Sequence, residues 1–322
     1  MSRWRRFFGR RIRGAALAAA MVLPLAGMAC HAQPPAQQSH EILRVGTAFG
    51  PLTEPLTQEY RQALPNVDVQ SVPAPNSIDV IHAIQKGTAD FGVAFSNDTY
   101  AGYWSRDQGA SRAVRGVALL QPLSQYLLVR GRSGIHDVKD LRGRVVGVGP
   151  KDSSSSIVGR LVLEAFELDP LTIKVISTRA AAAEALINRT IDAVILPGYV
   201  YPDAVMSSAI KDGAYFVPIT GPAVDRLRET HPFVRVTAIP RNVIAGQTSV
   251  IPTIGVDMVV VCAGDLDEAL VYELTKQLFI AFPRLSGVEA GLRFLNAEEA
   301  AATPIPLHPG AARYFREREL SR

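Results

Sequence analysis

A pattern of strand, helix, strand, helix, strand occurs twice in this sequence, and both copies carry the same short mark just before the last strand. The mark is Thr-x-Asp, at Thr88 to Asp90 and again at Thr190 to Asp192, each between an amphipathic stretch with a basic end and an apolar run. Asp90 lies 45 positions after Val45, in the first strand of the first copy, and Asp192 lies 44 positions after Val148, in the first strand of the second. Alternating strands and helices favour a parallel, right-handed wound sheet. The sequence therefore predicts two similar α/β units.

The expected elements follow from apolar periodicity and from the Gly, Pro and Asn punctuation between the periodic stretches. In the first unit we expect strands at 42–47, 67–72 and 91–95, with helices at 51–64 and 77–86. In the second unit we expect strands at 145–148, 172–177 and 193–196, with helices at 157–167 and 180–188.

Small and polar residues follow the ends of these strands, where wound α/β sheets bind their ligands. Hydroxyl and amide groups there are candidates for holding a polar ligand, and an aromatic ring for covering its apolar part. For each of these residues, a role in a turn or a helix cap is as good an explanation. The candidates in the strand exits are Thr47, Ala48, Phe49, Asn76, Ser77, Ser96, Asn97, Pro197, Gly198 and Tyr199.

A cluster of four serines, Ser153, Ser154, Ser155 and Ser156, follows the strand that ends at Gly149-Pro150. The unpaired N–H groups and the positive dipole end of a helix start favour anions, and Lys151 adds a positive charge. Asp152 or Ser153 as a simple helix cap is the alternative. One cap uses one hydroxyl and leaves the other serines unexplained. These residues are candidates for binding a carboxylate.

Two further β-prone stretches, 119–129 and 251–261, suit strands that cross between the units. With them we expect lobe 1 at 41–124 and 256–322, and lobe 2 at 125–255. A discontinuous first lobe with two crossovers is the architecture of a hinged binding protein, in which closure traps a ligand.

The N-terminal 32 residues have the form of an export signal, with six arginines, no acidic residue and an apolar run that is short for a membrane span. Cleavage after Ala29 or after Ala32, or lipid modification at Cys30, are the alternatives, and Arg5-Arg6 leaves both the general and the twin-arginine export routes open. Residues 33–40 suit a flexible linker. We expect a periplasmic protein.

Without the six leader arginines, the chain carries 28 basic and 30 acidic residues. The basic pI of 9.1 therefore does not indicate nucleic-acid binding. Metal and nucleotide motifs are missing, the six histidines are scattered, and Cys262 ends an apolar run as a buried hydrophobe would. We expect no catalytic residue, metal or cofactor, although a Ser/His pair assembled by the fold stays an alternative.

Several stretches resemble the TAXI family, the extracytoplasmic receptors of tripartite ATP-independent periplasmic (TRAP) transporters. The segment DVKDLRGRVVGVG, from Asp137 to Gly149, resembles solute-binding proteins in general. The stretches similar to the TAXI family are 46–65, 86–103, 190–205, 225–240, 251–279 and 303–317, so that the resemblance covers nearly all of 42–318.

The resemblance implies the two-lobed periplasmic-binding-protein type II fold, with a ligand cleft between the lobes and two hinge crossovers. It also implies capture of a small organic anion, such as glutamate or a dicarboxylate, by a monomeric receptor that delivers it to a membrane permease. The family's glycine-rich ligand loops are replaced here around Pro51 to Glu54, Ala74 to Ser77 and Ser153 to Ser156. The ligand is therefore open. A ligand-binding module for a membrane sensor kinase and an exported hydrolase are the other functions considered.

Overall fold

The computed structural model describes residues 41–104, 111–151, 153–168, 173–198, 204–243, 247–288 and 297–320. The expected export signal, the linker, Cys30, Asp152 and Tyr199 lie outside these residues. In the part of the chain before the first crossing strand, the elements are β1 (Glu41–Thr47), α1 (Gly50–Ala63), β2 (Val67–Pro73), α2 (Ser77–Gln85), β3 (Phe91–Phe95) and α3 (Ser96–Trp104).

The first crossing strand and the second α/β unit follow. They comprise β4 (Val114–Val129), the 3-10 helix η1 (Val138–Leu141), β5 (Val146–Val148), α4 (Ser154–Ala165), β6 (Ile173–Val175), α5 (Arg179–Ile187) and β7 (Ala193–Gly198). The remaining elements are α6 (Ala204–Lys211), β8 (Tyr215–Val217), α7 (Pro222–Thr230), β9 (Arg235–Ile239), β10 (Ile251–Ala263), α8 (Glu268–Val288) and α9 (Pro309–Leu320).

One mixed sheet of ten strands contains both units, in the order β2-β1-β3-β10-β4-β7-β5-β6, with β8 paired to β4 and β9 paired to β10. Within each unit the strands are parallel, β1 with β2 and β3, and β5 with β6 and β7. This confirms the wound α/β order that the sequence predicts for both units.

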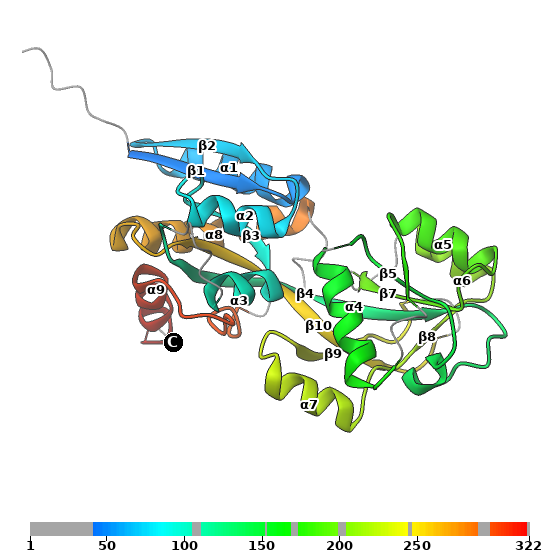
Figure 1. Ribbon diagram of the computed structural model, residues 1–322. Helices are drawn as coiled ribbons and strands as arrows, with labels where there is room; N and C mark the ends of the chain where they lie inside the picture. The colour runs from blue at the N-terminus through cyan, green and yellow to red at the C-terminus, as the bar shows by residue number, and fades with distance from the viewer. Residues whose placement is uncertain are drawn as a thin grey trace, which may run out of the picture. The chain divides into compact units, whose positions relative to one another are not determined.

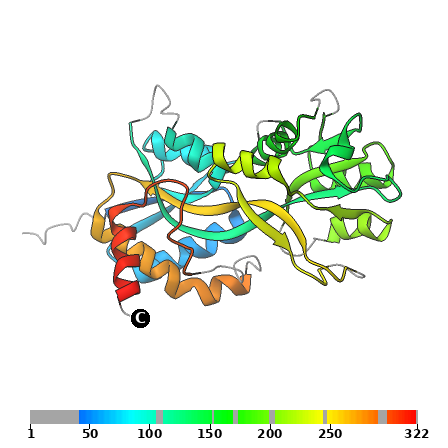
Figure 2. The same ribbon diagram turned by 90° about the horizontal axis from the view of Figure 1, so that it is seen from below.

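The long strands β4 and β10 run side by side from one unit to the other (Figures 1 and 2). They pair with each other as far as Ser124 and Gly255. Beyond these residues, β4 pairs with β7 and β8, whereas β10 pairs with β9. A pair of strands that exchange partners at the same level is a suitable place for a hinge, and the sequence-based lobe limits at this level stay a prediction.

We call lobe 1 the part built on β1–β3 and the adjoining parts of β4 and β10, with α1, α2, α3, α8 and α9. Its sheet is covered on one face by a core that includes Leu56, Leu274 and Phe315, and on the other by a core that includes Ile81 and Val259. All five side chains are buried.

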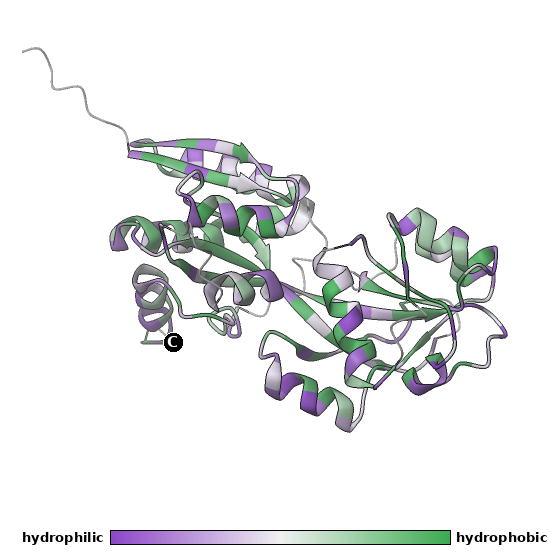
Figure 3. Cartoon of the chain, viewed as in Figure 1, coloured by the Kyte–Doolittle hydropathy of each residue, from purple (hydrophilic) through white to green (hydrophobic). Residues whose placement is uncertain are grey.

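Lobe 2 is built on β5–β9 and the other parts of β4 and β10, with α4–α7. One core packs α4 and α7 against the sheet through residues such as Val162 and Leu227, and a second core packs α5 and α6 through Ala182 and Met206. Figure 3 shows the contrast between the hydrophobic strands and the largely hydrophilic α7. The cores hold each lobe together, and the carboxyl ends of the parallel strands stay free for other contacts.

Candidate functional site

The exits of β1 and β3 in lobe 1 are joined by an aromatic pair. Phe49, which precedes α1, packs edge-on against Phe95 at the end of β3, with ring centroids 5.0 Å apart. Thr47 ends β1, and its hydroxyl donates to the carbonyl of Val72, 3.3 Å away. Ala48 is half-buried beside the core that faces α2. This corner therefore offers aromatic surface and little unpaired polarity.

Asn76 and Ser77, at the start of α2, carry hydrogen bonds of the fold. The Asn76 Oδ1 atom accepts from the backbone N–H of Asp79 at 3.1 Å, which confirms that Asn76 caps this helix. The Ser77 Oγ atom accepts from the backbone N–H of Phe95 at 2.7 Å. Ser77 thereby fixes the start of α2 against the end of β3.

Ser96 and Asn97 begin α3 directly after β3, although the sequence suggested a loop at 96–99. The buried Ser96 Oγ atom donates to the carbonyl of Phe233 at 3.2 Å and accepts from the N–H of Asp257 at 3.1 Å. A helix that starts at the strand exit exposes its first N–H groups there, which the expected loop would not.

The serine cluster forms the first turn of α4, which begins at Ser154, three residues before the predicted start. Ser153 is the N-cap, because its Oγ atom accepts from the backbone N–H of Ser156 at 3.2 Å. Ser155 lies against the backbone of Gly149, where a β-carbon would come within 1.7 Å of its Oγ atom. Ser156 is buried. Capping accounts for Ser153 alone, and Lys151 beside it is exposed.

The two lobes touch at the exits that the sequence singled out. The Ser154 Oγ atom of α4 donates to the Oδ1 atom of Asn97 in α3, 2.5 Å away. Phe233 of lobe 2 packs its ring against Tyr100 of α3, with centroids 5.6 Å apart. Ser154 and Ser96 are therefore on the same side of the molecule, and the structure brings α3 and α4 together by their first turns.

The exit of β7 contributes a cation that sequence reasoning missed. Arg179, the first residue of α5, donates from Nη1 to the carbonyl of Pro197 at 2.5 Å. Gly198 is required at its position, because a β-carbon would lie 2.0 Å from the ring of Tyr126. Arg179 follows a predicted strand and a capping Thr178, and that position was the available signal.

Two buried carboxyl groups also lie at the meeting point of the lobes. Burial raises the pKa of Asp98, while hydrogen bonds from Ser77 and Asn97 and the nearby His82 act in the opposite direction. Burial raises the pKa of Asp257 to about 6, against the effect of Arg235. Both carboxyl groups therefore take up a proton at a higher pH than an exposed aspartate does.

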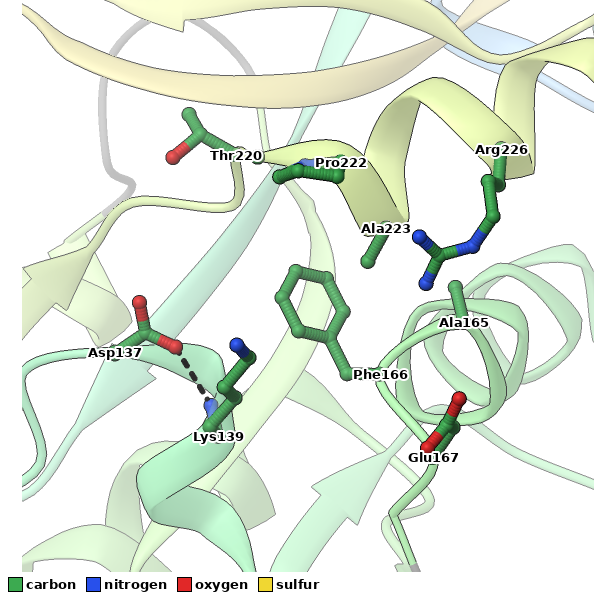
Figure 4. A pocket seen from close by; sticks show the side chains of 10 residues that line it. Asp137, Lys139, Ala165, Phe166, Glu167, Thr220, Pro222, Ala223 and Arg226 are labelled. Atoms are coloured by element: carbon green, nitrogen blue, oxygen red, sulfur yellow. Dashed lines mark hydrogen bonds between the residues drawn. The ribbon is translucent and has the colours of Figure 1, made fainter.

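Two hollows have similar volumes, one away from the strand exits and one beside the exit of β3. One, of about 350 Å³, is lined by residues that include Phe166 at the end of α4 and Pro222 at the start of α7 (Figure 4). In it, the Asp137 carboxylate accepts from the backbone N–H of Lys139 as part of a capping box. The other, also about 350 Å³, is lined by Ser96, Arg235 and Asp257 among others. The first hollow is at the opposite end of α4 from the serine cluster.

Cys262 and His308 carry side chains of types that can act in catalysis, but both serve the fold here. Burial raises the pKa of the Cys262 thiol, so it is a poor nucleophile. The Nδ1 atom of His308 accepts from the N–H of Gly310 at the start of α9. Within the described residues, no three His, Cys, Asp or Glu side chains are grouped as metal ligands. No helix there combines the length and the apolar character that crossing a membrane requires.

A family model described as the NMT1-like family matches residues 44–318. The chain belongs to the NMT1-like family. The match covers both units and the crossing strands, and therefore every element described from β2 to α8.

Solved structures share the fold of this NMT1-like chain at low sequence identity. XAC2383 from Xanthomonas citri, bound to a chloride ion, has a TM-score of 0.53 and 14% identity over 86% of this chain and 95% of its own. PhnD1 from Prochlorococcus marinus, in complex with methylphosphonate, has a TM-score of 0.50 and 12% identity over 87% and 98%. The predicted periplasmic-binding-protein type II fold is confirmed.

Proposed function

We propose that this protein is an exported, non-catalytic solute receptor that binds a small organic anion between its lobes. The observation that carries the proposal is the meeting of α3 and α4 by their first turns, through Ser154 and Asn97. Two helix starts that converge from different lobes place positive dipole ends on either side of one point. A ligand there would join the lobes, as in hinged binding proteins.

The residues proposed to hold the anion are those that the serine cluster and the strand exits bring there. Backbone N–H groups and hydroxyls of Ser154 and Ser155 would donate hydrogen bonds to a carboxylate, with Arg179 and Lys151 adding positive charge. Asn97 would turn from Ser154 to the ligand, and Phe49 would cover its apolar part. Ser77 and Ser96 serve the fold, and would position these groups rather than contact the ligand.

The finer proposal is that the protein is the receptor of a TRAP transporter and delivers its ligand to a membrane permease, as the TAXI resemblance implies. We propose a monomeric protein in the periplasm, with glutamate and dicarboxylates as the first ligands to try. The proteins named above hold chloride and methylphosphonate, both anions. For this reason the ligand panel includes phosphonates and sulfonates as well as carboxylates.

A thermal-shift screen of the mature protein against this panel tests the proposal. An anion that binds the folded state raises the melting temperature by mass action, by an amount that grows with its concentration. If no anion of the panel raises the melting temperature, the proposed function is contradicted. If the protein instead hydrolyses members of a second panel, made of esters and amides, the exported hydrolase is favoured.

A matched pair of helix caps tests the role of α4 in particular. Ser153→Ala and Asp137→Ala each remove an N-cap, of α4 and of the 3-10 helix η1 respectively, and each should lower the free energy of unfolding by about 1 kcal/mol. Only Ser153→Ala should also reduce the ligand-induced shift, because it loosens the turn that holds the anion. Equal ligand shifts in both variants would remove the α4 start from the site.

A further inference from the structure

Two glutamines stand in the crossing strand β4 between the lobes. Gln121, Leu123 and Gln125 occupy every second position of the strand, so their side chains lie on the same face of the sheet. The register from Gln121 to Ser124 is regular, so no bulge separates them. Gln121 is 1% and Gln125 is 0% exposed. Amide side chains are rarely buried so completely in a strand.

The amide groups of these glutamines lack the hydrogen bonds that burial normally requires. Gln125 has no partner for either Oε1 or Nε2 within the described chain, and Gln121 has none for Oε1. The Gln121 Nε2 atom is 3.0 Å from the sulfur of Met258, a weak acceptor. Most buried polar side chains in folded proteins are paired, and unpaired ones call for an explanation such as a missing ligand or water.

Both glutamines lie level with the strand exits. Gln121 is opposite Met258 of β10, which is itself opposite Phe95 at the end of β3. Gln125 is opposite Pro197 at the end of β7. Because directly opposite residues of an antiparallel pair share a face, the two amides lie on the same face of the sheet as the side chains of Phe95 and Pro197. The pair therefore spans the distance between the β3 exit of lobe 1 and the β7 exit of lobe 2.

We propose that Gln121 and Gln125 form the floor of the ligand site and bind hydrogen-bond donors on the uncharged part of the ligand. This inference rests on the proposed function. The unpaired atoms are two carbonyl oxygens and one NH2 group, so the floor accepts more hydrogen bonds than it donates. It is neutral and does not compete with α4 for the anionic group. The ligand class is an organic anion that carries a hydroxyl or amino substituent.

Pairs of anions that differ in one substituent test this assignment by calorimetric titration. The pairs are L-malate with succinate, and L-glutamate or 2-hydroxyglutarate with glutarate. The wild type should bind the substituted member more tightly, by about tenfold for one additional good hydrogen bond. Gln125→Leu should abolish this preference and change the affinity for the unsubstituted member by less than about twofold, since it leaves the α4 contacts intact.

The matched control is Gln85→Leu. Gln85 is also a buried glutamine, but its Nε2 atom donates to the carbonyl of Gly102 at 2.8 Å. In the absence of ligand, Gln125→Leu should raise the melting temperature, because an unpaired amide is replaced by an apolar group of similar size, and Gln85→Leu should lower it. Gln85→Leu should keep the preference for the substituted anions.

The outcomes separate the two proposals. A substituent preference that survives in Gln125→Leu would overturn the floor and leave the receptor function standing. A lowered melting temperature of unliganded Gln125→Leu, comparable to that of Gln85→Leu, would also overturn it, because the amide would then be bonded within the fold. If the wild type binds no anion of the wider panel, the receptor function fails and the floor fails with it.

Discussion

The first α/β unit, in lobe 1, and the second, in lobe 2, end their second helix with the same turn. After α2, the backbone N–H of Thr88 donates to Ala83 at 2.9 Å, and that of Asp90 donates to Arg44 at 2.8 Å. After α5, the corresponding N–H groups of Thr190 and Asp192 donate to Ala185 and Val145 at 2.9 and 2.8 Å. The backbone bonds of the Thr-x-Asp mark are thus the same in both units.

The side chains around the two turns differ. Asp90 is buried and bonded to Arg44 at 2.9 Å and to Arg112 at 2.6 Å. Asp192 is more exposed, and bonds Arg130 and the N–H of Val145 at 2.9 and 3.0 Å. The comparison teaches that the aspartate ties the turn to the first strand of its unit, through the backbone N–H of Arg44 in β1 or of Val145 just before β5. The number of arginines around it is larger where it is more deeply buried.

The largest difference between the units should appear when the aspartates are removed. Asp90→Ala leaves two arginines beside a partly buried cavity and should lower the free energy of unfolding by about 3 kcal/mol. Asp192→Ala should lower it by about 1 kcal/mol, because Asp192 is more exposed than Asp90 and its removal leaves one arginine without its partner instead of two. Denaturant titration measures both, and equal losses would contradict the comparison.

Two aspartates, Asp90 in the turn of the first unit and Asp257 in β10, should affect the pH dependence of the free energy of unfolding in opposite directions. Burial raises the pKa of Asp90, but hydrogen bonds from Arg44 and Arg112 outweigh it, and the net pKa is lowered. Its stabilising contribution is therefore present above the pKa of the unfolded chain and is lost as pH falls through the lower folded pKa.

Asp257 has the opposite sign, because its pKa is raised to about 6 in the folded protein. The wild type should therefore gain stability relative to Asp257→Asn as pH falls from 7 to 4, by up to about 2 kcal/mol. Relative to Asp90→Asn, the wild type should lose stability as pH falls below about 4. Chemical denaturation at several pH values gives both differences, and parallel profiles would count against the assigned shifts.

The smallest effect concerns the left-handed residue of each turn. It is Gly87 with φ of 74° in the first unit and Arg189 with φ of 59° in the second. Gly87→Ala should destabilise by about 1 kcal/mol, because an added methyl group has room but the backbone is strained. Arg189→Gly should stabilise by no more than about 0.5 kcal/mol, since relief of strain is partly offset by backbone entropy. Melting temperatures of the two variants check this, and shifts in the same direction would be a contradiction.

Most of the fold was predictable from the sequence, because each strand, helix and turn is indicated by signals within a few residues of it. The apolar runs of β4 and β10 and the Asn76 cap were sufficient to place the units and the crossings. The start of α4 was misplaced because serine has little helix preference, yet the first turn tolerates it where N–H groups are unpaired.

The candidate site was predictable as a region but not as a set of contacts. The pairing of Ser154 with Asn97 joins residues 57 positions apart, and depends on how the lobes meet. Gln121 and Gln125 escaped notice because a single polar residue in an apolar run also suits a strand with one solvated face. Their burial comes from the side chains that pack over β4 in the folded protein.

The central claim is that two α/β units close on one anion, and a distance measurement between the lobes tests it most directly. Spin labels at Gln70→Cys on β2 and Lys174→Cys on β6 occupy exposed positions, whereas Cys262 is buried. Pulsed electron paramagnetic resonance should show a broad distribution of distances between the two labels without ligand. It should narrow toward the closed arrangement when the most stabilising anion of the panel is added. An anion that raises the melting temperature and leaves the distribution unchanged would contradict the account.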